Sequence, residues 1–374
     1  MDTVLMHSSS LFPAFVASLP LAVAITASPA EDAIVSFAQL TQNYNLVSLG
    51  DAAIRNYGDT EGGIAVGGNL TIDGGVIAAL PSKFGQTDAL PTLYVNGSLN
   101  YTGNGSLLRL QTGHASLPGF SPGADWNPVS RELASAGVTQ LSQISSTSTH
   151  AAADPRSTAL DPGWDFAAIK AQYQAISSTL ASLAPTGAVS VTGQQLAFTA
   201  APDAHGAIIF DLDASLLAGN FYDGQMFSGI SIDVPEAAVF VINVLNADGR
   251  TLFGGGVNFN YDDSYSRLLW NIVGADDAAG QTVSFGNGGQ FYGSILAPNY
   301  LVTNTGNTPI SGQVVAGSFD YGNAELHFTD FGFPTGFDEP LPPVPEPATY
   351  GLAGAGALLG LAFWRRRAGR DRRL

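Results

Sequence analysis

The chain contains no cysteine among its 374 residues. This absence excludes disulfide frameworks, thiolate metal sites and cysteine nucleophiles, whichever compartment the protein occupies. Lysine is almost absent as well, since it occurs only as Lys83 and Lys170. A charged fraction of only 12%, together with 44 glycines and 10% aromatic residues, favours a mainly β protein with tight turns over a helical bundle.

Positive charge is scarce throughout and is concentrated at one end. The formal net charge is −17, and six of the 14 Lys and Arg residues fall within residues 365–373. Residues 31–344 keep 28 of the 31 acidic residues but only 8 of the 14 basic ones. Such an acidic body repels phosphate backbones and acidic membranes, so we expect no binding to nucleic acid.

Residues 11–27 form an apolar run of the length found in signal peptides. Small residues suited to cleavage follow, and they place the cut after Ala24, Ala27 or Ala30. Residues 1–10 contain no Lys or Arg, so either the first region of this signal is atypical or the true start differs. We therefore assign residues 1–30 to an export signal.

The C-terminal region contains a second apolar run, residues 348–364, which is uncharged over its whole length. As a helix it would extend roughly 25 Å, slightly less than the ~30 Å hydrocarbon core of a bilayer. The cluster Arg365, Arg366 and Arg367 follows immediately, and by the positive-inside rule it would remain in the cytoplasm. The pattern predicts a short C-terminal transmembrane helix that anchors the chain weakly.

Just before this run lie Pro345, Glu346 and Pro347. A Pro-Glu-Pro motif, a short apolar helix and an arginine cluster, in this order, resemble the PEP-CTERM sorting signal over residues 341–374. The resemblance implies a Gram-negative host and an exosortase partner, a membrane enzyme that recognises and removes the tail. It also implies that the protein is anchored transiently in the inner membrane before it reaches the cell surface or the extracellular matrix.

Short β-type segments separated by Gly and Asn recur through the middle of the chain. One pattern appears at Val66–Leu70, Val95–Leu99 and Val315–Phe319, and a second appears at Gly293–Ala297 and Gly312–Ala316, nineteen residues apart. Nineteen residues is the size of one coil of a β-solenoid, in which each rung buries its inward side chains against the next. We therefore expect a right-handed parallel β-solenoid with Val66, Val95 and Val315 pointing inward. The hairpins of an antiparallel sandwich remain an alternative.

One long helix is expected beside this solenoid. After Asp165, a suitable N-cap, apolar residues recur with 3–4 spacing as far as Leu183, and Pro185 closes the segment. The helix should run over about residues 165–183 and cover one apolar flank of the sheets. Residues 111–160 are rich in Ser, Ala and Pro and predict a loop-like excursion with one short helix near Val129–Ile144.

Several phrases in residues 31–340 resemble the choice-of-anchor A domain, an adhesive domain found upstream of various cell-surface sorting tails. They are Tyr44–Asp51, Asp59–Asn69, Asp165-Phe166, Val241–Val244, Leu269–Asn271, Gly293–Pro298, Gly312–Ser318 and Glu325–His327. The resemblance implies a surface protein and supplies no nucleophile to carry over. A weaker likeness to the bacterial ice-binding solenoids rests on the same combination of a coil stack and one long helix.

No motif of catalysis or metal binding stands out, and we predict no cofactor and no enzymatic activity. Serine is absent from any Gly-x-Ser-x-Gly elbow, and the five histidines lack partners close in sequence. The acidic pairs Asp262-Asp263 and Asp276-Asp277 lack EF-hand spacing, so a loop calcium site is conceivable but unsupported. Thr303-Asn304-Thr305 is a single threonine fragment, whereas an ice-binding face needs threonines on rung after rung.

The expected function is adhesive or structural, in a cell-surface layer or an extracellular matrix. Expected partners are the exosortase and exopolysaccharide or other surface glycans, with membrane contact through the C-terminal helix before processing. Two alternatives remain open. One is a secreted carbohydrate-active enzyme on a β-solenoid, which would need an aromatic-lined groove with two carboxylates about 5–10 Å apart. The other is an ice- or surface-binding protein.

Overall fold

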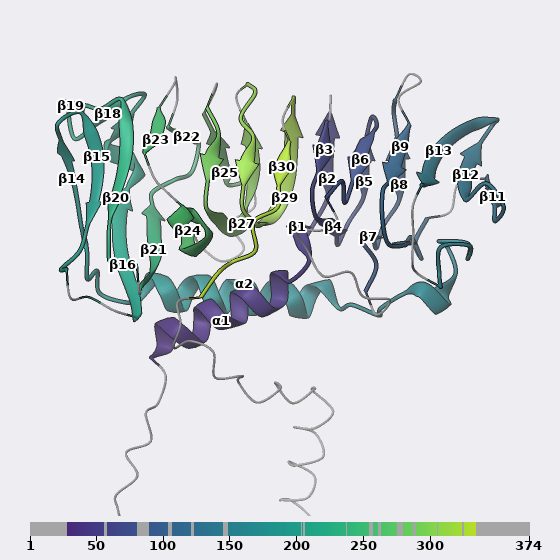
Figure 1. The fold of residues 1–374 in the computed structure, drawn as a ribbon, viewed down its shortest axis with the longest axis horizontal. Helices are drawn as coiled ribbons and strands as arrows, with labels where there is room; N and C mark the ends of the chain where they lie inside the picture. The colour runs from purple at the N-terminus through teal and green to yellow at the C-terminus, as the bar shows by residue number, and fades with distance from the viewer. Residues whose placement is uncertain are drawn as a thin grey trace, which may run out of the picture.

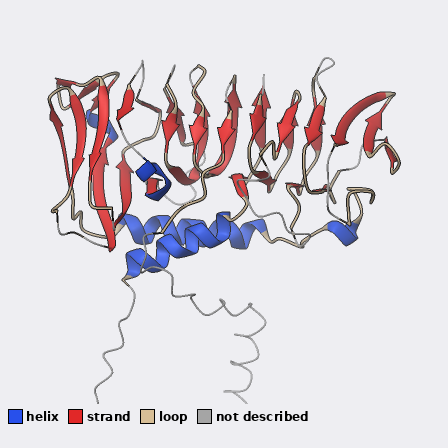
Figure 2. Ribbon diagram, in the orientation of Figure 1, coloured by secondary structure: helices blue, strands red, loops and turns tan. Residues whose placement is uncertain are grey.

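The computed structural model describes residues 28–333 except 56–57, 81–89, 104–106, 121–122, 145–148, 203, 205, 237, 254–256, 261–262, 275–279, 287–288, 305 and 324. This part of the chain is mainly β and contains two α-helices, α1 (Pro29–Thr41) and α2 (Phe166–Ala181). Short 3-10 helices are η2 (Thr158–Leu160), η3 (Ala214–Leu216) and η4 (Asp263–Arg267). The strands form a long stack, and both α-helices lie along one side of it (Figures 1 and 2).

The largest sheet has 14 strands and is bent, so that its strands form two faces that meet at the bend. The helix face contains, in stacking order, β10 (Ala115–Ser116), β7 (Leu93–Val95), β4 (Gly63–Val66), β1 (Tyr44–Ser48), β29 (Val314–Gly322), β27 (Ser294–Asn304), β24 (Leu268–Ile272), β21 (Ala238–Leu245) and β16 (Gly206–Asp213). The second face, which we call the ladder face, contains β8 (Leu99–Tyr101), β5 (Leu70–Ile72), β2 (Ala52–Arg55), the second halves of β29 and β27, β25 (Thr282–Phe285) and β22 (Arg250–Leu252).

Three smaller sheets complete the stack. The nine-stranded sheet has the order β11 (Ala124–Asn127), β12 (Glu132–Ser135), β13 (Val138–Gln143), β9 (Leu108–Leu110), β6 (Gly75–Ile77), β3 (Asp59–Thr60), β30 (Leu326–His327), β28 (Ile310–Ser311) and β26 (Phe291–Tyr292). The four-stranded sheet has the order β14 (Ala188–Thr192), β15 (Gln195–Thr199), β20 (Gly229–Asp233) and β23 (Asn258–Asn260). The three-stranded sheet has the order β17 (Leu217–Ala218), β18 (Phe221–Tyr222) and β19 (Gln225–Met226).

The nineteen-residue recurrence is confirmed as a structural register. Ile295 pairs with Val314, Leu296 with Val315 and Ala297 with Ala316, all in parallel. Each pairing that the structure describes within the 14-stranded sheet is parallel. Stacked coils require such pairing, whereas a sandwich of hairpins would pair its strands in antiparallel fashion.

The other recurrence is confirmed at two positions and wrong at the third. Val66 and Val95 pair with each other and are buried in the interior between the faces. Val315 instead pairs with Val47 and packs against the helices. Between the helix face and the ladder face, strand β29 has one residue fewer than the segment that runs from β4 to β5. Successive side chains of a strand alternate between the two sides of the sheet. A shift of one position therefore reverses the direction of Val315.

The chain does not follow the stack from one end to the other. Strand β1 lies between β4 and β29, so the first coil pairs with both the second and the last. From β1 the coils proceed to the end that carries β11, and α2 then runs back towards the end that carries β14 (Figure 1). The remaining coils return to the middle and close against β1.

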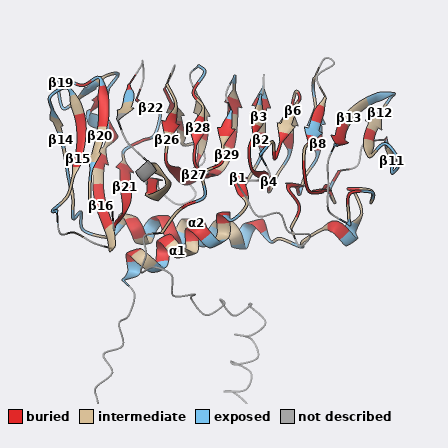
Figure 3. Cartoon of the chain, viewed as in Figure 1, coloured by how far each residue is buried: buried red, intermediate tan, exposed pale blue. Residues whose placement is uncertain are grey.

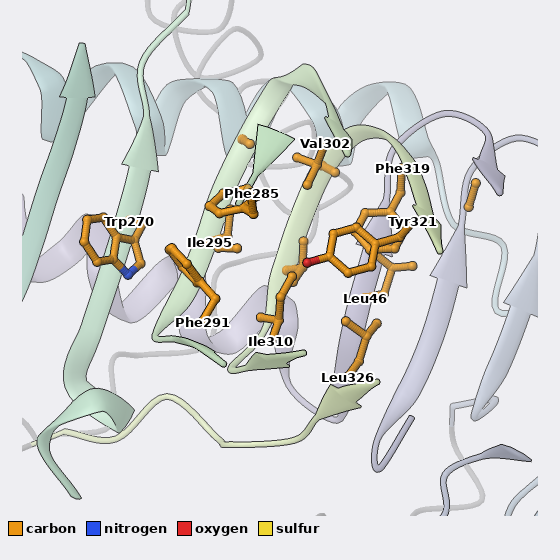
Figure 4. Packing of buried hydrophobic residues seen from close by; sticks show 14 of the residues in the cluster. Leu46, Trp270, Phe285, Phe291, Ile295, Val302, Ile310, Phe319, Tyr321 and Leu326 are labelled. Carbon is orange, nitrogen blue, oxygen red and sulfur yellow. The ribbon is translucent and has the colours of Figure 1, made fainter. Parts of the chain in front are cut away.

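Apolar side chains fill the interior between the sheets. Figure 3 shows that most strands of the stack contain buried residues. Trp270, Phe285 and Phe291 meet there, with ring centroids 5.3 Å apart for Trp270–Phe291 and 4.6 Å for Phe285–Phe291 (Figure 4). Two coils further on, beyond β27, Phe319 and Tyr321 stack with ring centroids 4.9 Å apart. Large side chains on neighbouring coils thus hold the stack together in place of disulfides.

The predicted long helix is confirmed as α2, whose N-cap Asp165 accepts hydrogen bonds from the backbone N–H groups of Ala167 and Ala168. The expectation of a single flanking helix is wrong, because α1 packs beside α2. Helix α1 begins with a capping box formed by Ser28 and Glu31, and it buries Ile34 and Phe37. The sequence did not predict this helix because its first turn overlaps residues 1–30, which were assigned to an export signal.

The short helix expected near Val129–Ile144 is also wrong. Strands β12 and β13 occupy that segment and pair in antiparallel fashion. The turn between them places Ala136 at φ 50° and Gly137 at φ 77°, a left-handed conformation that a helix does not contain. The predicted transmembrane helix at residues 348–364 lies outside the described residues. Within residues 28–333, no described helix is long and apolar enough to span a membrane.

Candidate binding face

A ladder of small side chains, polar at every position except Ala53, runs along the ladder face, with one residue from each coil. The registers align Asn100 with Thr71, Thr71 with Ala53, Ala53 with Asp320, Asp320 with Thr303, Thr303 with Ser284, and Ser284 with Thr251. Their strand neighbours, such as Ile54, Val302 and Phe285, point into the interior, so these seven residues point outward. They form a single row that the helices leave uncovered.

Neighbouring strands of a sheet lie about 4.8 Å apart, which gives this row a regular spacing. Parts of the row are held by hydrogen bonds between side chains. The hydroxyl oxygens of Ser284 and Thr303 lie 2.5 Å apart, and Asn100 Nδ2 donates to Thr71 Oγ1 at 3.5 Å. A row fixed in this way presents hydroxyl, carboxylate and amide groups with little conformational freedom left to lose on binding.

An ion pair lies in the middle of the row. Both terminal nitrogens of Arg55 donate to the carboxylate of Asp320, at 2.5 and 3.1 Å. This contact raises the pKa of the Arg55 guanidinium. Beside the pair lies an open hollow of about 390 Å³. Its lining consists of Arg55, Thr303, Asn304, Gly306, Asp320, Gly322 and Asn323.

Asn304 supports the hollow by bridging two coils. Its Nδ2 donates to the carbonyl of Gly322 at 2.6 Å, and the N–H of Gly322 donates back to Asn304 Oδ1 at 3.0 Å. The hollow therefore has a wall fixed by backbone contacts and contains both signs of charge. It suits a hydrated polar polymer better than an apolar ligand.

The helix face is unavailable for binding because α1 and α2 cover it. Outward side chains of this face, among them Tyr94, Val241 and Val315, pack against Phe37, Tyr173 and other helix residues. Tyr173 is fully buried, and burial raises the pKa of its hydroxyl. Of the two long faces of the 14-stranded sheet, one is thus covered by helices and the other is exposed to solvent.

A second polar cluster lies around His327. His327 Nε2 lies 3.2 Å from Glu325 Oε2, and Gln290 Nε2 lies 2.8 Å from His327 Nδ1. Ser311 Oγ is 3.5 Å from the same Nδ1. The expectation that no histidine has a partner close in sequence is therefore wrong, because Glu325 is two positions away.

This cluster resembles a Ser-His-Glu triad only in composition. The Gln290 amide donates to the nitrogen that would have to accept the serine proton, and Ser311 is buried. A nucleophile needs that nitrogen free and its oxygen exposed to substrate. The arrangement is a fixed hydrogen-bond network rather than a catalytic one.

A protein-family model described as "Putative Ice-binding-like adhesive domain" matches residues 37–328. This range contains the whole ladder and most of the stack. The chain belongs to this family. A second model, the PEP-CTERM protein-sorting motif, matches residues 343–367, which implies export and membrane-linked sorting to the cell surface of a Gram-negative bacterium.

Solved structures similar to this member of the ice-binding-like adhesive family include ice-binding proteins. One is a glycosylated ice-binding protein from an Arctic yeast, with a TM-score of 0.31 and 13% identity over 82% of this chain and 95% of that one. Another is an ice-binding protein from the Antarctic ascomycete Antarctomyces psychrotrophicus, with a TM-score of 0.29 and 11% identity over 78% and 96%. Among curated proteins, none matches the chain.

The sorting residues predicted from the sequence, Pro345, Glu346, Pro347 and Arg365–Arg367, lie outside the described residues. So do Asp262, Asp276 and Asp277 of the acidic pairs, while Asp263 begins η4. In the part of the adhesive domain that the structure describes, no three acidic or histidine side chains gather as metal ligands.

The ladder itself is not apparent from the sequence. Thr303 belongs to an isolated threonine fragment there, yet in the structure it aligns with Ser284, and Thr71 lies in the same row. The available signal was alternation: in Leu70-Thr71-Ile72 and Val283-Ser284-Phe285 one polar residue stands between two buried ones. Only the strand pairing between coils shows that these central polar residues form one row.

Proposed function

We propose that this protein is an exported adhesive or structural component of the cell surface or extracellular matrix, and that it binds a hydrated polymer such as exopolysaccharide through the ladder face. The in-register row of seven small residues on an uncovered face carries this proposal. The fold that supports it is, in our interpretation, a right-handed parallel β-solenoid, and an exosortase is the partner that processes the tail. We further propose that the protein is not an enzyme.

The positions of the two ends of the domain support this function. Ser28 caps α1, and Phe331 packs on Phe37 of the same helix with ring centroids 5.7 Å apart. Residues 28 and 333 therefore both lie on the helix-covered side of the stack (Figure 1). A chain held by its C-terminal tail would turn this side towards the membrane and would leave the ladder face free.

The proposal is tested by placing bulky side chains on the row. A Thr71→Tyr/Thr303→Tyr double variant keeps β-type residues in both strands but destroys the flat row. We expect its binding to exopolysaccharide from the native host to fall about tenfold or more, with an unchanged melting temperature. An Ala171→Tyr/Gln172→Tyr variant on the exposed side of α2 is the matched control. Equal binding by the ladder variant and the wild type would refute the role of this face.

A second candidate function is binding to ice or another ordered surface. The specific observation in its favour is that four of the seven ladder residues carry hydroxyl groups, namely Thr71, Thr303, Ser284 and Thr251. The ion pair of Arg55 and Asp320 interrupts that ladder with strongly hydrated charges, which favours a polar polymer. Thermal hysteresis and inhibition of ice recrystallisation by the purified protein would decide in favour of ice.

A further inference from the structure

The exposed apolar side chains of the described residues are concentrated at the two ends of the stack. Of seven large hydrophobic residues that are exposed, only Leu80 lies elsewhere. Val129, Val138 and Ile144 lie at the β11 end, by which we mean residues 107–160. Leu216, Phe221 and Met226 lie at the β14 end, by which we mean residues 186–236.

The exposure of these side chains is large enough to matter. Val129 is 91% exposed and Val138 53% exposed at one end, while Met226 is 52% exposed at the other. Phe221 and Met226 are direct cross-strand partners in β18 and β19, so they form one contiguous apolar patch. Contiguous exposed apolar groups on a soluble domain mark sites of interaction.

The outermost strand at the β14 end is also unprotected. Strand β14 pairs only with β15 among the described strands, over five residues without a break in register. Its sequence, Ala-Val-Ser-Val-Thr, contains no charge and no proline. Natural proteins usually blunt such an edge with Lys, Pro or a bulge, because its free N–H and C=O groups will pair with another chain.

Charge distinguishes the partners that this edge can accept. Residues 186–236 contain six acidic residues and no Lys or Arg, so two β14 ends would repel each other. Residues 107–160 balance three acidic residues with Arg109, Arg131 and Arg156. Three of the eight basic residues in the acidic body therefore lie at the opposite end of the stack.

From these observations we infer that copies of this chain associate end to end, with the β14 end of one copy seated on the β11 end of the next. In this arrangement β14 pairs with β11, which likewise has only one neighbour, β12, among the described strands. The contact is heterologous, so it generates a row rather than a closed dimer. Repetition along the stack axis keeps all helix faces, and hence all tails, on one side. It also joins the ladder faces of successive copies.

The absence of cysteine from the chain allows a direct test by cross-linking. Asp125→Cys in β11 and Ser190→Cys in β14 replace exposed residues at the two ends. The full-length variants are produced in the native host, and surface thiols are joined with a short bismaleimide. We expect the double variant to give dimers, trimers and larger species, with a cross-linked peptide that joins positions 125 and 190. A mixture of the two single variants should stop at dimers.

Controls separate this arrangement from other contacts. A Ser190→Cys/Ala171→Cys variant, whose second thiol lies on α2, should remain monomeric. Adding Met226→Glu and Val138→Glu to the Asp125→Cys/Ser190→Cys variant should lower the yield of cross-linked species about fivefold or more, and both sites are exposed enough to spare the fold. Dimers from Ser190→Cys alone would show that like ends meet and would overturn the inference. A double variant that cross-links no better than the control would overturn it as well.

Discussion

At the scale of single residues, buried amides fasten α2 to the sheet. Asn243 and Asn271 are adjacent in register on the helix face and both are fully buried. Asn243 Nδ2 donates to the carbonyl of Leu180 at 3.1 Å, and Asn271 Nδ2 donates to the carbonyl of Ser177 at 3.0 Å. The Leu180 carbonyl is among the last four of α2, which lack a partner one turn further along the helix, whereas the Ser177 carbonyl lies one turn earlier. The two amides therefore fasten the last turns of α2 to the sheet.

Replacing Asn271 by alanine tests this attachment. The change removes the bonds to the Ser177 carbonyl and to Asn243 Oδ1, and it leaves the Ser177 hydroxyl without its acceptor at 2.6 Å. Buried polar groups left unpaired cost about 1–3 kcal/mol each, so we expect the free energy of unfolding to fall by about 2–4 kcal/mol. Denaturant titration measures it. Asn100→Ala on the exposed ladder is the control and should change it by less than about 0.5 kcal/mol. A loss below about 1 kcal/mol for Asn271→Ala would contradict this role.

At the scale of elements, sequence patterns predicted those helices and strand pairings that depend on a single segment of the chain. Asp165 and the spacing of Phe166, Tyr173 and Leu180 located α2 because a cap and a periodic apolar face are contained within one segment. The pairing of Ile295 with Val314 followed from a direct repeat. The β12–β13 hairpin was missed because its turn depends on left-handed conformations at Ala136 and Gly137, and alanine gives no signal for one.

The candidate site was predicted far less well, for a physical reason. The ladder joins Thr71, Asp320 and Thr303, which are separated by hundreds of positions in sequence or lie in different coils. Its order depends on β1 pairing with β29, a contact between the first and the last coil. No pattern within a window of sequence contains that information.

Helix α1 gives a prediction about the mature N-terminus. Ser28 Oγ accepts from the N–H of Glu31 at 3.3 Å, the Ser28 N–H donates to Glu31 Oε2 at 3.1 Å, and Ala30 is buried. Cleavage after Ala30 would remove this cap, which is worth about 1 kcal/mol, whereas cleavage after Ala24 or Ala27 preserves it. We expect N-terminal sequencing of the exported protein to show a first residue at or before Ser28. A mature chain that begins at Glu31 would contradict this expectation.

At the scale of the whole molecule, the order of the coils determines how the domain is presented. The first and last coils meet in the middle of the stack. Helix α1 begins near β16 and leads into β1, and the last coil ends beside this helix. Phe331 contacts both Phe37 and Phe333 there, at 5.7 Å in each case. The C-terminal segment therefore starts from the helix-covered side, near the centre of the stack, and a tail in the membrane would hold the stack there with the ladder face turned outward.

This geometry leads to a prediction about the sorting motif itself. Proline disfavours a helix at its own position and at the one before it, so we predict that residues 345–347 present an extended backbone to a processing enzyme. By the positive-inside rule, we predict that the arginines at 365–367 set the orientation of the short apolar run. We expect Glu346→Ala and, separately, Arg365→Ser/Arg366→Ser/Arg367→Ser to leave the domain folded but to change where the protein accumulates. All four positions follow the adhesive-domain match over residues 37–328, so we expect the melting temperature to stay the same.

Cell fractionation of the native host, with mass spectrometry of the mature C-terminus, measures the outcome. Wild-type protein should appear at the surface or in the medium without Leu374, and both variants should remain with the membrane at a larger fraction. A Thr186→Ser variant, exposed in the loop after α2, should be processed like the wild type. Release of wild-type protein with Leu374 still attached, or normal processing of both variants, would show that this tail does not direct sorting. The domain would then need another attachment to keep its helix-covered side towards the cell.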